Sequence, residues 1–166
     1  AQGKCTELNE VLKTSRNETL VKLIEDESIK YAFFECLVES PYEKAYLQIK
    51  DTFNKTRDAN IYLYLEKMAY NLGLMNEASD FSTKVEMVDD QMVLANEFLY
   101  RYQIIKQKSE PIAMERFFTY TNQNPSYIKV NENNPIIIDF YYDYYLDLIK
   151  GKNKVFEFLL FDYPVD

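Results

Sequence analysis

The feature that most constrains this chain is the stretch from Asn134 to Gly151, because it is almost wholly apolar and aromatic. Asn134 suits the N-cap of a helix, Pro135 suits its first turn, and Gly151 suits the left-handed position just past its end. A helix this apolar must be covered on most sides. The sequence therefore predicts further helices that pack around it.

Chain-breaking residues are scarce, which favours helices throughout. The 166 residues include only 3 Gly and 5 Pro, too few for the many turns of a β fold. Aromatic residues reach 16%, with 15 Tyr and 11 Phe, so many tyrosine hydroxyls must lie at the edge of the core or near a partner. The length suits one domain, and we expect a single all-helical domain over residues 1–166.

Apolar residues recur every three or four positions, which predicts helices joined by short turns. The predicted helices cover residues 6–13, 17–24, 26–39, 41–54, 58–73, 76–88, 90–107, 109–124, 134–151 and 153–161. The side chains expected to cap them are Asn17, Ser40, Asp58, Asn76, Asp90 and Asn134. Residues 126–133 are expected to form a polar connection. For the last segment, KVFEFLLF, periodicity leaves a strand as the alternative.

Three of the predicted helices carry an alanine soon after a short turn. These residues, Ala45, Ala78 and Ala113, follow one another at intervals of 33 and 35 residues. A small residue at this place lets two helices approach closely, and a period of about 34 is typical of stacked helical hairpins. The spacing predicts an α-solenoid of antiparallel hairpins with short helices at its N-terminal end. An irregular α-helical bundle is the alternative.

Over residues 28–125 this pattern resembles the tetratricopeptide-repeat (TPR) family. The residues that match the family's pattern are Leu65, Ala69, Gly73, Ala78, Ala113, Phe117 and Pro125. The chain departs from the family at Phe33, Glu66 and Arg101, where a small residue is usual. The resemblance implies that a ligand lies on the concave face lined by the first helix of each hairpin. The positions implied in this chain are Asn60, Lys67, Tyr70, Asn71, Phe98, Tyr102 and Lys106.

Residues that usually perform catalysis are scarce. The chain has no His, which removes the commonest general base and the commonest zinc ligand. Its glycines, Gly3, Gly73 and Gly151, are too far apart for a phosphate-binding loop. We therefore expect no enzyme, no metal site and no cofactor, while a pair of carboxylates assembled by the fold is left open.

The chain is acidic. Its 27 acidic and 19 basic residues give a net charge of −8, which disfavours binding to nucleic acid or to an anionic membrane surface. A basic protein partner is compatible with this charge, as is a simple role in solubility. No apolar run reaches the length of a membrane span.

The two cysteines, Cys5 and Cys36, are either joined in one disulfide or kept as buried thiols. The chain starts at Ala1 without Met, which is typical of a mature end left by removal of a secretory signal and equally of a start chosen in cloning. Two glycosylation sequons, at Asn17 and Asn54, matter only in a secreted eukaryotic chain. We expect an extracytoplasmic protein, secreted or periplasmic, rather than a cytoplasmic one.

The helix expected at 134–151 carries an acidic stripe. Asp139, Asp143 and Asp147 occupy every fourth position and so share one face, with Tyr142 and Tyr145 beside them. Aspartate together with tyrosine suits the recognition of Lys or Arg. The simpler interpretation is the solvated edge of a buried helix.

Taken together, these features favour a non-enzymatic module that binds a protein or peptide. An inhibitor or immunity-type protein that neutralises a basic partner is one concrete version. The alternatives are a small-molecule or lipid carrier with an aromatic-lined pocket and an enzyme that uses carboxylates. The expected binding residues are those of the acidic stripe with its two tyrosines and those of the concave face.

Overall fold

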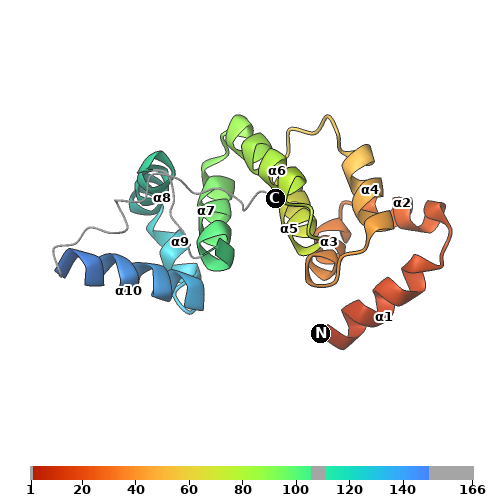
Figure 1. Ribbon diagram of the computed structural model, residues 1–166, viewed down its shortest axis with the longest axis horizontal. Helices are drawn as coiled ribbons and strands as arrows, with labels where there is room; N and C mark the ends of the chain where they lie inside the picture. The colour runs from red at the N-terminus through yellow and green to blue at the C-terminus, as the bar shows by residue number, and fades with distance from the viewer. Residues whose placement is uncertain (1, 106–110, 150–166) are drawn as a thin grey trace. The chain divides into compact units, whose positions relative to one another are not determined.

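Helices joined by turns make up the part of the chain that the computed structural model describes, namely residues 2–105 and 111–149 (Figure 1). Within these ranges there are ten α-helices and no strand. They are α1 (Gln2–Lys13), α2 (Asn17–Glu25), α3 (Lys30–Glu39), α4 (Glu43–Thr52), α5 (Ala59–Asn71), α6 (Met75–Val88), α7 (Gln91–Ile105), α8 (Pro111–Gln123), α9 (Pro125–Val130) and α10 (Pro135–Ile149). The all-helical class predicted from the sequence is therefore confirmed.

Some sequence predictions fall outside these ranges. The described residues do not include Lys106, Gly151 or the predicted helix 153–161, which contains KVFEFLLF. Among the helices that are described, none has the length and apolar character needed to cross a membrane.

The chain divides into two compact units, and the boundary between Lys84 and Val85 falls inside α6. The first unit holds α1 to α5 and most of α6, and the second holds the end of α6 and α7 to α10. The sequence predicts one domain over 1–166.

In the first unit, α3 packs against α1, α2 and α5, and α4 packs against α2 and α5. Phe34 is fully buried at the centre of this packing, where its ring meets Tyr64 at 5.6 Å and Phe53 at 6.2 Å between centroids. A disulfide joins Cys5 of α1 to Cys36 of α3, with 5.1 Å between the two Cα atoms. The first helix is thus held to the third both covalently and by packing.

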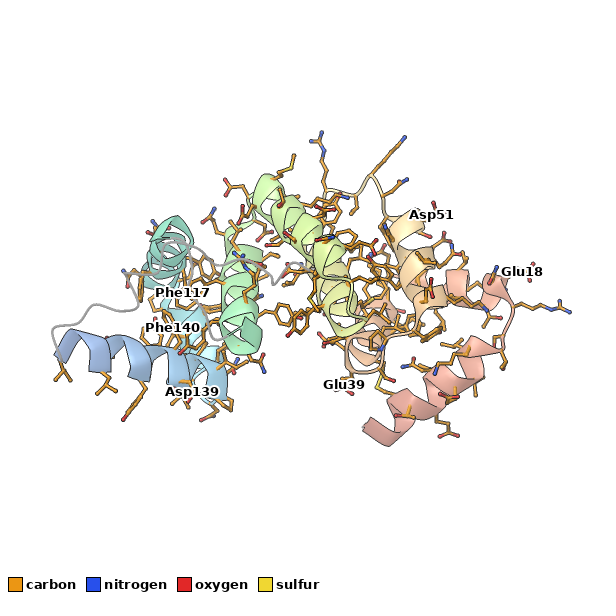
Figure 2. All side chains as sticks on the ribbon, viewed as in Figure 1. Glu18, Glu39, Asp51, Phe117, Asp139 and Phe140 are labelled. Carbon is orange, nitrogen blue, oxygen red and sulfur yellow. A yellow bond between two sulfur atoms is a disulfide. The ribbon has the colours of Figure 1, made fainter. Side chains whose placement is uncertain are left out.

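In the second unit, α7 packs against α8 and α10, and α9 packs against α8. The core is a cluster of phenylalanines. Phe98 stacks on Phe117 at 4.9 Å between centroids, and Phe140 meets them edge-on at 5.2 and 5.3 Å. Figure 2 shows Phe117 and Phe140 close together between α8 and α10. One side of the aromatic α10 helix is therefore buried, as Ile137 and Phe140 show.

Several helix ends follow the predicted chemistry. Asp58 accepts a hydrogen bond from the Asn60 amide at 3.0 Å, and Asn134 accepts one from the Ile136 amide at 3.0 Å. Asp90 accepts bonds from the first amides of α7 in the same way. Gly73 adopts a φ of +79°, and the amide after it bonds back to Ala69 at 2.8 Å. This is the left-handed helix end that only a glycine adopts without strain.

Other predicted caps are wrong. Ser40 ends α3 by donating its amide to Cys36, so α4 begins only at Glu43 and has no side-chain cap. Asn17 is the first residue of α2 rather than its cap. Asn76 lies inside α6, because the turn at Gly73 is so short that the first α6 bond already runs from Ala78 to Leu74.

Two element boundaries also differ from the prediction. The helix expected from Asp26 begins only at Lys30, because the Asp26 carboxylate accepts bonds from the amide and hydroxyl of Ser28 and holds a turn there. The segment 126–133 is not a plain connection, since α9 occupies Pro125–Val130. Tertiary contacts favour this helix, because the Tyr127 hydroxyl donates to Asn96 of α7 at 2.7 Å.

Candidate functional site

A polar, tyrosine-bearing surface runs along the packed helices α3 and α5 of the first unit. We name it the α3–α5 face and define it by Tyr31, Glu35, Asp58, Tyr64, Lys67 and Asn71. Tyr31 and Glu35 lie one helical turn apart on α3, and Tyr64, Lys67 and Asn71 lie at intervals of three and four on α5. Both spacings place side chains on one side of a helix. Because the two helices pack together, their polar sides form one surface.

Hydrogen bonds join the two helices along this face. The Tyr31 hydroxyl donates to Asp58 Oδ2 at 2.5 Å, and the Tyr64 hydroxyl donates to Glu35 Oε1 at 2.7 Å. Farther along, Asn71 Nδ2 donates to the main-chain oxygen of Val38 at 2.6 Å, and the rings of Tyr31 and Tyr64 lie 5.9 Å apart between centroids. The tyrosines are therefore fixed in orientation while remaining partly exposed.

The surroundings raise the pKa of both phenols above that of a free tyrosine. Burial raises the pKa of Tyr31 to about 12, with a further contribution from its hydrogen bond to Asp58. Burial and the hydrogen bond to Glu35 raise the pKa of Tyr64 in the same direction. Burial lowers the pKa of the Lys67 ammonium, whose Nζ atom lies 5.8 Å from the centre of the Tyr64 ring. The face thus presents fixed aromatic rings with carboxylates at its edge.

The structure places the predicted concave-face residues in two different surroundings. Asn60, Lys67 and Asn71 lie on the same side of α5 as Tyr64, whereas Tyr70 lies beside that row. In the second unit, Phe98 is buried in the phenylalanine cluster. Tyr102 also belongs to this cluster, with its ring 5.3 Å from that of Phe140.

Sequence reasoning missed the α3 half of this face. Tyr31, Glu35 and Tyr64 were not predicted to be site residues. A signal was present, because Tyr31 and Tyr64 are 33 residues apart, the same interval that separates Ala45 from Ala78. Under the predicted repeat, residues in equivalent positions of neighbouring hairpins are expected to meet.

The outer side of α10 carries a different surface. Ile138, Tyr142, Tyr145 and Ile149 are 53%, 66%, 55% and 83% exposed. Their spacing of four, three and four residues places them on one side of the helix, and we name this row the α10 outer stripe. The row is apolar and aromatic, which is unusual for an exposed helix side.

The predicted acidic stripe lies partly outside the described structure. Asp139 is exposed, and Figure 2 shows it on the side of α10 away from Phe117. The side chains of Asp143 and Asp147 lie outside the described part. Asp139 therefore lies beside the α10 outer stripe.

One group of charged residues in the second unit is largely buried. Glu97 and Arg101, both buried, form an ion pair at 2.7 Å within α7, and Glu86 approaches the same arginine at 3.8 Å. In the part of the chain that is described, no three His, Cys, Asp or Glu residues come together in a way that could hold a metal ion.

Comparison with known proteins returns no relative. The chain matches no protein-family model, and neither the curated proteins nor the solved structures contain a match to it. Functional inference therefore depends on the geometry described above.

Proposed function

We propose that this protein is a non-enzymatic helical module that binds a protein or peptide through the α3–α5 face. The observation that carries this proposal is the pair of partly exposed tyrosines, Tyr31 and Tyr64, each held by a hydrogen bond to a carboxylate of the other helix. Tyrosine is enriched among residues that dominate binding energy. A ring already fixed in place loses little conformational entropy when a partner binds.

The partner has basic groups. Glu35 and Asp58 place carboxylates beside the two rings, and the whole chain carries a net charge of −8. An arginine or lysine of a partner gains both from a carboxylate and from the face of an aromatic ring. An inhibitor or immunity-type protein that neutralises a basic partner fits this chemistry.

The helix arrangement that we propose together with this function is a TPR-like array of helical hairpins. Side-chain hydrogen bonds between helices support it, because they join residues 27 to 33 positions apart. The separation is 27 for Tyr31 with Asp58 and Lys50 with Glu77, 29 for Tyr64 with Glu35, 31 for Tyr127 with Asn96 and 33 for Asn71 with Val38. Contacts one repeat apart are what stacked hairpins of about 34 residues produce.

The disulfide between Cys5 and Cys36 supports an extracytoplasmic location, since disulfides persist in oxidising compartments. The phenylalanines of the second unit, which also suggested a carrier, are used for packing. Phe117 and Phe140 are each only 1% exposed and meet edge-on at 5.3 Å between centroids. A surface that binds a protein therefore has more support than an aromatic-lined pocket.

Matched charge reversals test the proposal. Glu35→Lys changes an exposed residue of the α3–α5 face, and Asp51→Lys changes an exposed residue of α4 that is not part of this face (Figure 2). Both change a single acidic residue to lysine, so they shift the net charge equally. Partner capture from the native organism, followed by titration of the captured partner, gives the affinity of each variant.

We expect Glu35→Lys to weaken binding by at least about tenfold, the equivalent of about 1.4 kcal/mol, and Asp51→Lys to leave it nearly unchanged. Equal affinities for the two variants would show that the α3–α5 face does not contact the partner. Circular dichroism of both variants checks that each remains folded.

A further inference from the structure

Two acceptor sequences for N-linked glycans lie in the first unit, and the proposed function uses neither. They are Asn17-Glu18-Thr19 and Asn54-Lys55-Thr56. In the whole chain these are the two Asn-x-Ser/Thr sequences whose middle residue is not proline. At Asn124 a serine also follows in the third position, but Pro125 lies between them, and a proline there excludes glycan transfer.

The structure places Asn54 in a turn between α4 and α5. The Thr56 amide bonds to the Phe53 carbonyl at 3.1 Å across this turn, and both Asn54 and Lys55 are exposed. A glycan is large and hydrophilic, so it needs an asparagine whose side chain reaches solvent. A surface turn between two packed helices provides that position.

Asn17 lies at the start of α2, and all three residues of its sequon are exposed. Within the described residues, no hydrogen bond holds the side-chain amide of either Asn17 or Asn54. The buried Asn9, in contrast, donates to the Ser40 carbonyl at 3.1 Å and is not part of a sequon. A glycan on Asn17 or Asn54 therefore displaces no described contact.

The disulfide between Cys5 and Cys36 supports the compartment that this modification needs. Disulfides form in the lumen of the endoplasmic reticulum, where N-linked glycans are also added. We propose that Asn17 and Asn54 each carry an N-linked glycan. This proposal rests on the extracytoplasmic location given above and narrows it to the secretory pathway of a eukaryotic cell.

The chemistry of the transfer needs one further reactant, a lipid-linked oligosaccharide diphosphate. A bond forms between the side-chain Nδ2 atom of the asparagine and the anomeric carbon of the first sugar. The bond from that carbon to the diphosphate oxygen breaks, the lipid diphosphate leaves, and the amide nitrogen gives up one proton. No residue is oxidised or reduced, so the disulfide is unaffected.

The two glycans would modify only one part of the molecule. Residues 85–164, which form the second unit, contain no sequon. Neither Asn17 nor Asn54 belongs to the α3–α5 face. The modification therefore adds hydrophilic surface at turns of the first unit without using the residues proposed to contact a partner.

Protein purified from its own organism tests the proposal directly. It is digested with trypsin without reduction, treated with peptide N-glycosidase in heavy-oxygen water and analysed by mass spectrometry. This enzyme releases a glycan by converting its asparagine to an aspartate that retains one heavy oxygen. The informative peptides are NETLVK with Asn17 and DTFNK with Asn54, and the control is Phe117–Lys129, which contains Asn124. We expect the label in both informative peptides and none in the control.

Variants secreted from eukaryotic cells give a second measurement. Asn17→Gln and Asn54→Gln keep an amide but remove the acceptor, and Asn124→Gln is the matched control. We expect each acceptor variant to lose one step of glycan-dependent mass, and the double variant to match the enzymatically deglycosylated protein. Substitution of Thr56 is avoided, because its hydroxyl oxygen accepts a hydrogen bond from the Asp58 amide at 3.1 Å.

The same spectra separate failure of this proposal from failure of the proposed location. Unlabelled Asn17 or Asn54 in native protein whose Cys5 and Cys36 peptides remain linked would overturn the glycan proposal alone. Free thiols at both cysteines would overturn it together with the extracytoplasmic location. Label at Asn124 would also overturn it, because the label would then not depend on a sequon.

Discussion

The two units of this protein join their helices by different means. In the first, directional contacts link neighbouring helices: the Cys5–Cys36 disulfide and the hydrogen bonds from Tyr31 and Tyr64. In the second, the centre is the stack of Phe98, Phe117 and Phe140. Hydrogen bonds fix the relative position of two helices while adding modest free energy, whereas buried rings add much free energy with less directional preference.

This difference explains why the candidate binding face lies in the first unit. A surface that recognises a partner needs side chains held in one orientation. Tyr31 and Tyr64 are held in this way because their hydroxyls have carboxylate partners on the facing helix. The phenylalanines of the second unit are equally well packed, but their burial leaves them unable to touch a partner.

The largest expected effect tests the ring stack. Phe117→Ala removes the side chain that contacts both Phe98 and Phe140, and we expect it to lower the free energy of unfolding by about 3–5 kcal/mol. Val130→Ala, at a residue that is 82% exposed in the same unit, is the control and should change it by less than about 0.5 kcal/mol. Urea unfolding measures both. Similar values for the two variants would contradict the role given to the stack.

The second effect concerns the disulfide of the first unit. Replacing Cys5 and Cys36 by Ser opens the loop between them, whose sequence separation is 31. A disulfide that closes a loop of this size stabilises the folded protein by about 2–4 kcal/mol. We expect a loss of that size in urea unfolding, with the Phe117→Ala effect unchanged in the same background. Mass spectrometry of the non-reduced protein provides the independent check: two free thiols would show that the bond is absent.

The smallest effect concerns the tyrosine–carboxylate contact. The pKa of Tyr31 is raised from 10.0 to about 12 in the folded protein. Its contribution to stability is therefore complete below pH 10 and is lost as the pH rises toward 12, because the unfolded chain releases this proton first. We expect Tyr31→Phe to lose less stability than the original protein over this range. Parallel curves of unfolding free energy against pH would contradict the assignment.

Local signals were enough to predict much of the fold. Asp58 and Asn134 cap their helices, and Gly73 ends a helix with positive φ. These features could be predicted because each depends only on residues within one helical turn. Ser40 failed as a cap because α4 begins only at Glu43, which puts Tyr42 at the capping position. Helix α9 was missed because its six residues are too few to show a helical period, and a contact from Tyr127 to another helix favours it.

Only the α5 half of the candidate site could be predicted from the sequence. Lys67 and Asn71 were found from the repeat pattern, but Tyr31 and Glu35 become part of the face only when α3 packs against α5. For α10, the sequence predicts cover on most sides, and the described structure buries the side of Ile137 and Phe140. The sequence could not say which side is buried, because Ile137 and Ile138 are chemically the same and differ only in direction from the helix axis.

The disulfide between α1 and α3 also has a mechanical consequence. A pulling force applied at the N-terminus passes through the bond from Cys5 directly to Cys36, so the loop between them, including α2, carries no tension. Its sequence separation of 31 residues corresponds to roughly 100 Å of contour length, which becomes available for extension only after reduction. Under load, the first unit therefore behaves as though its chain began at the third helix.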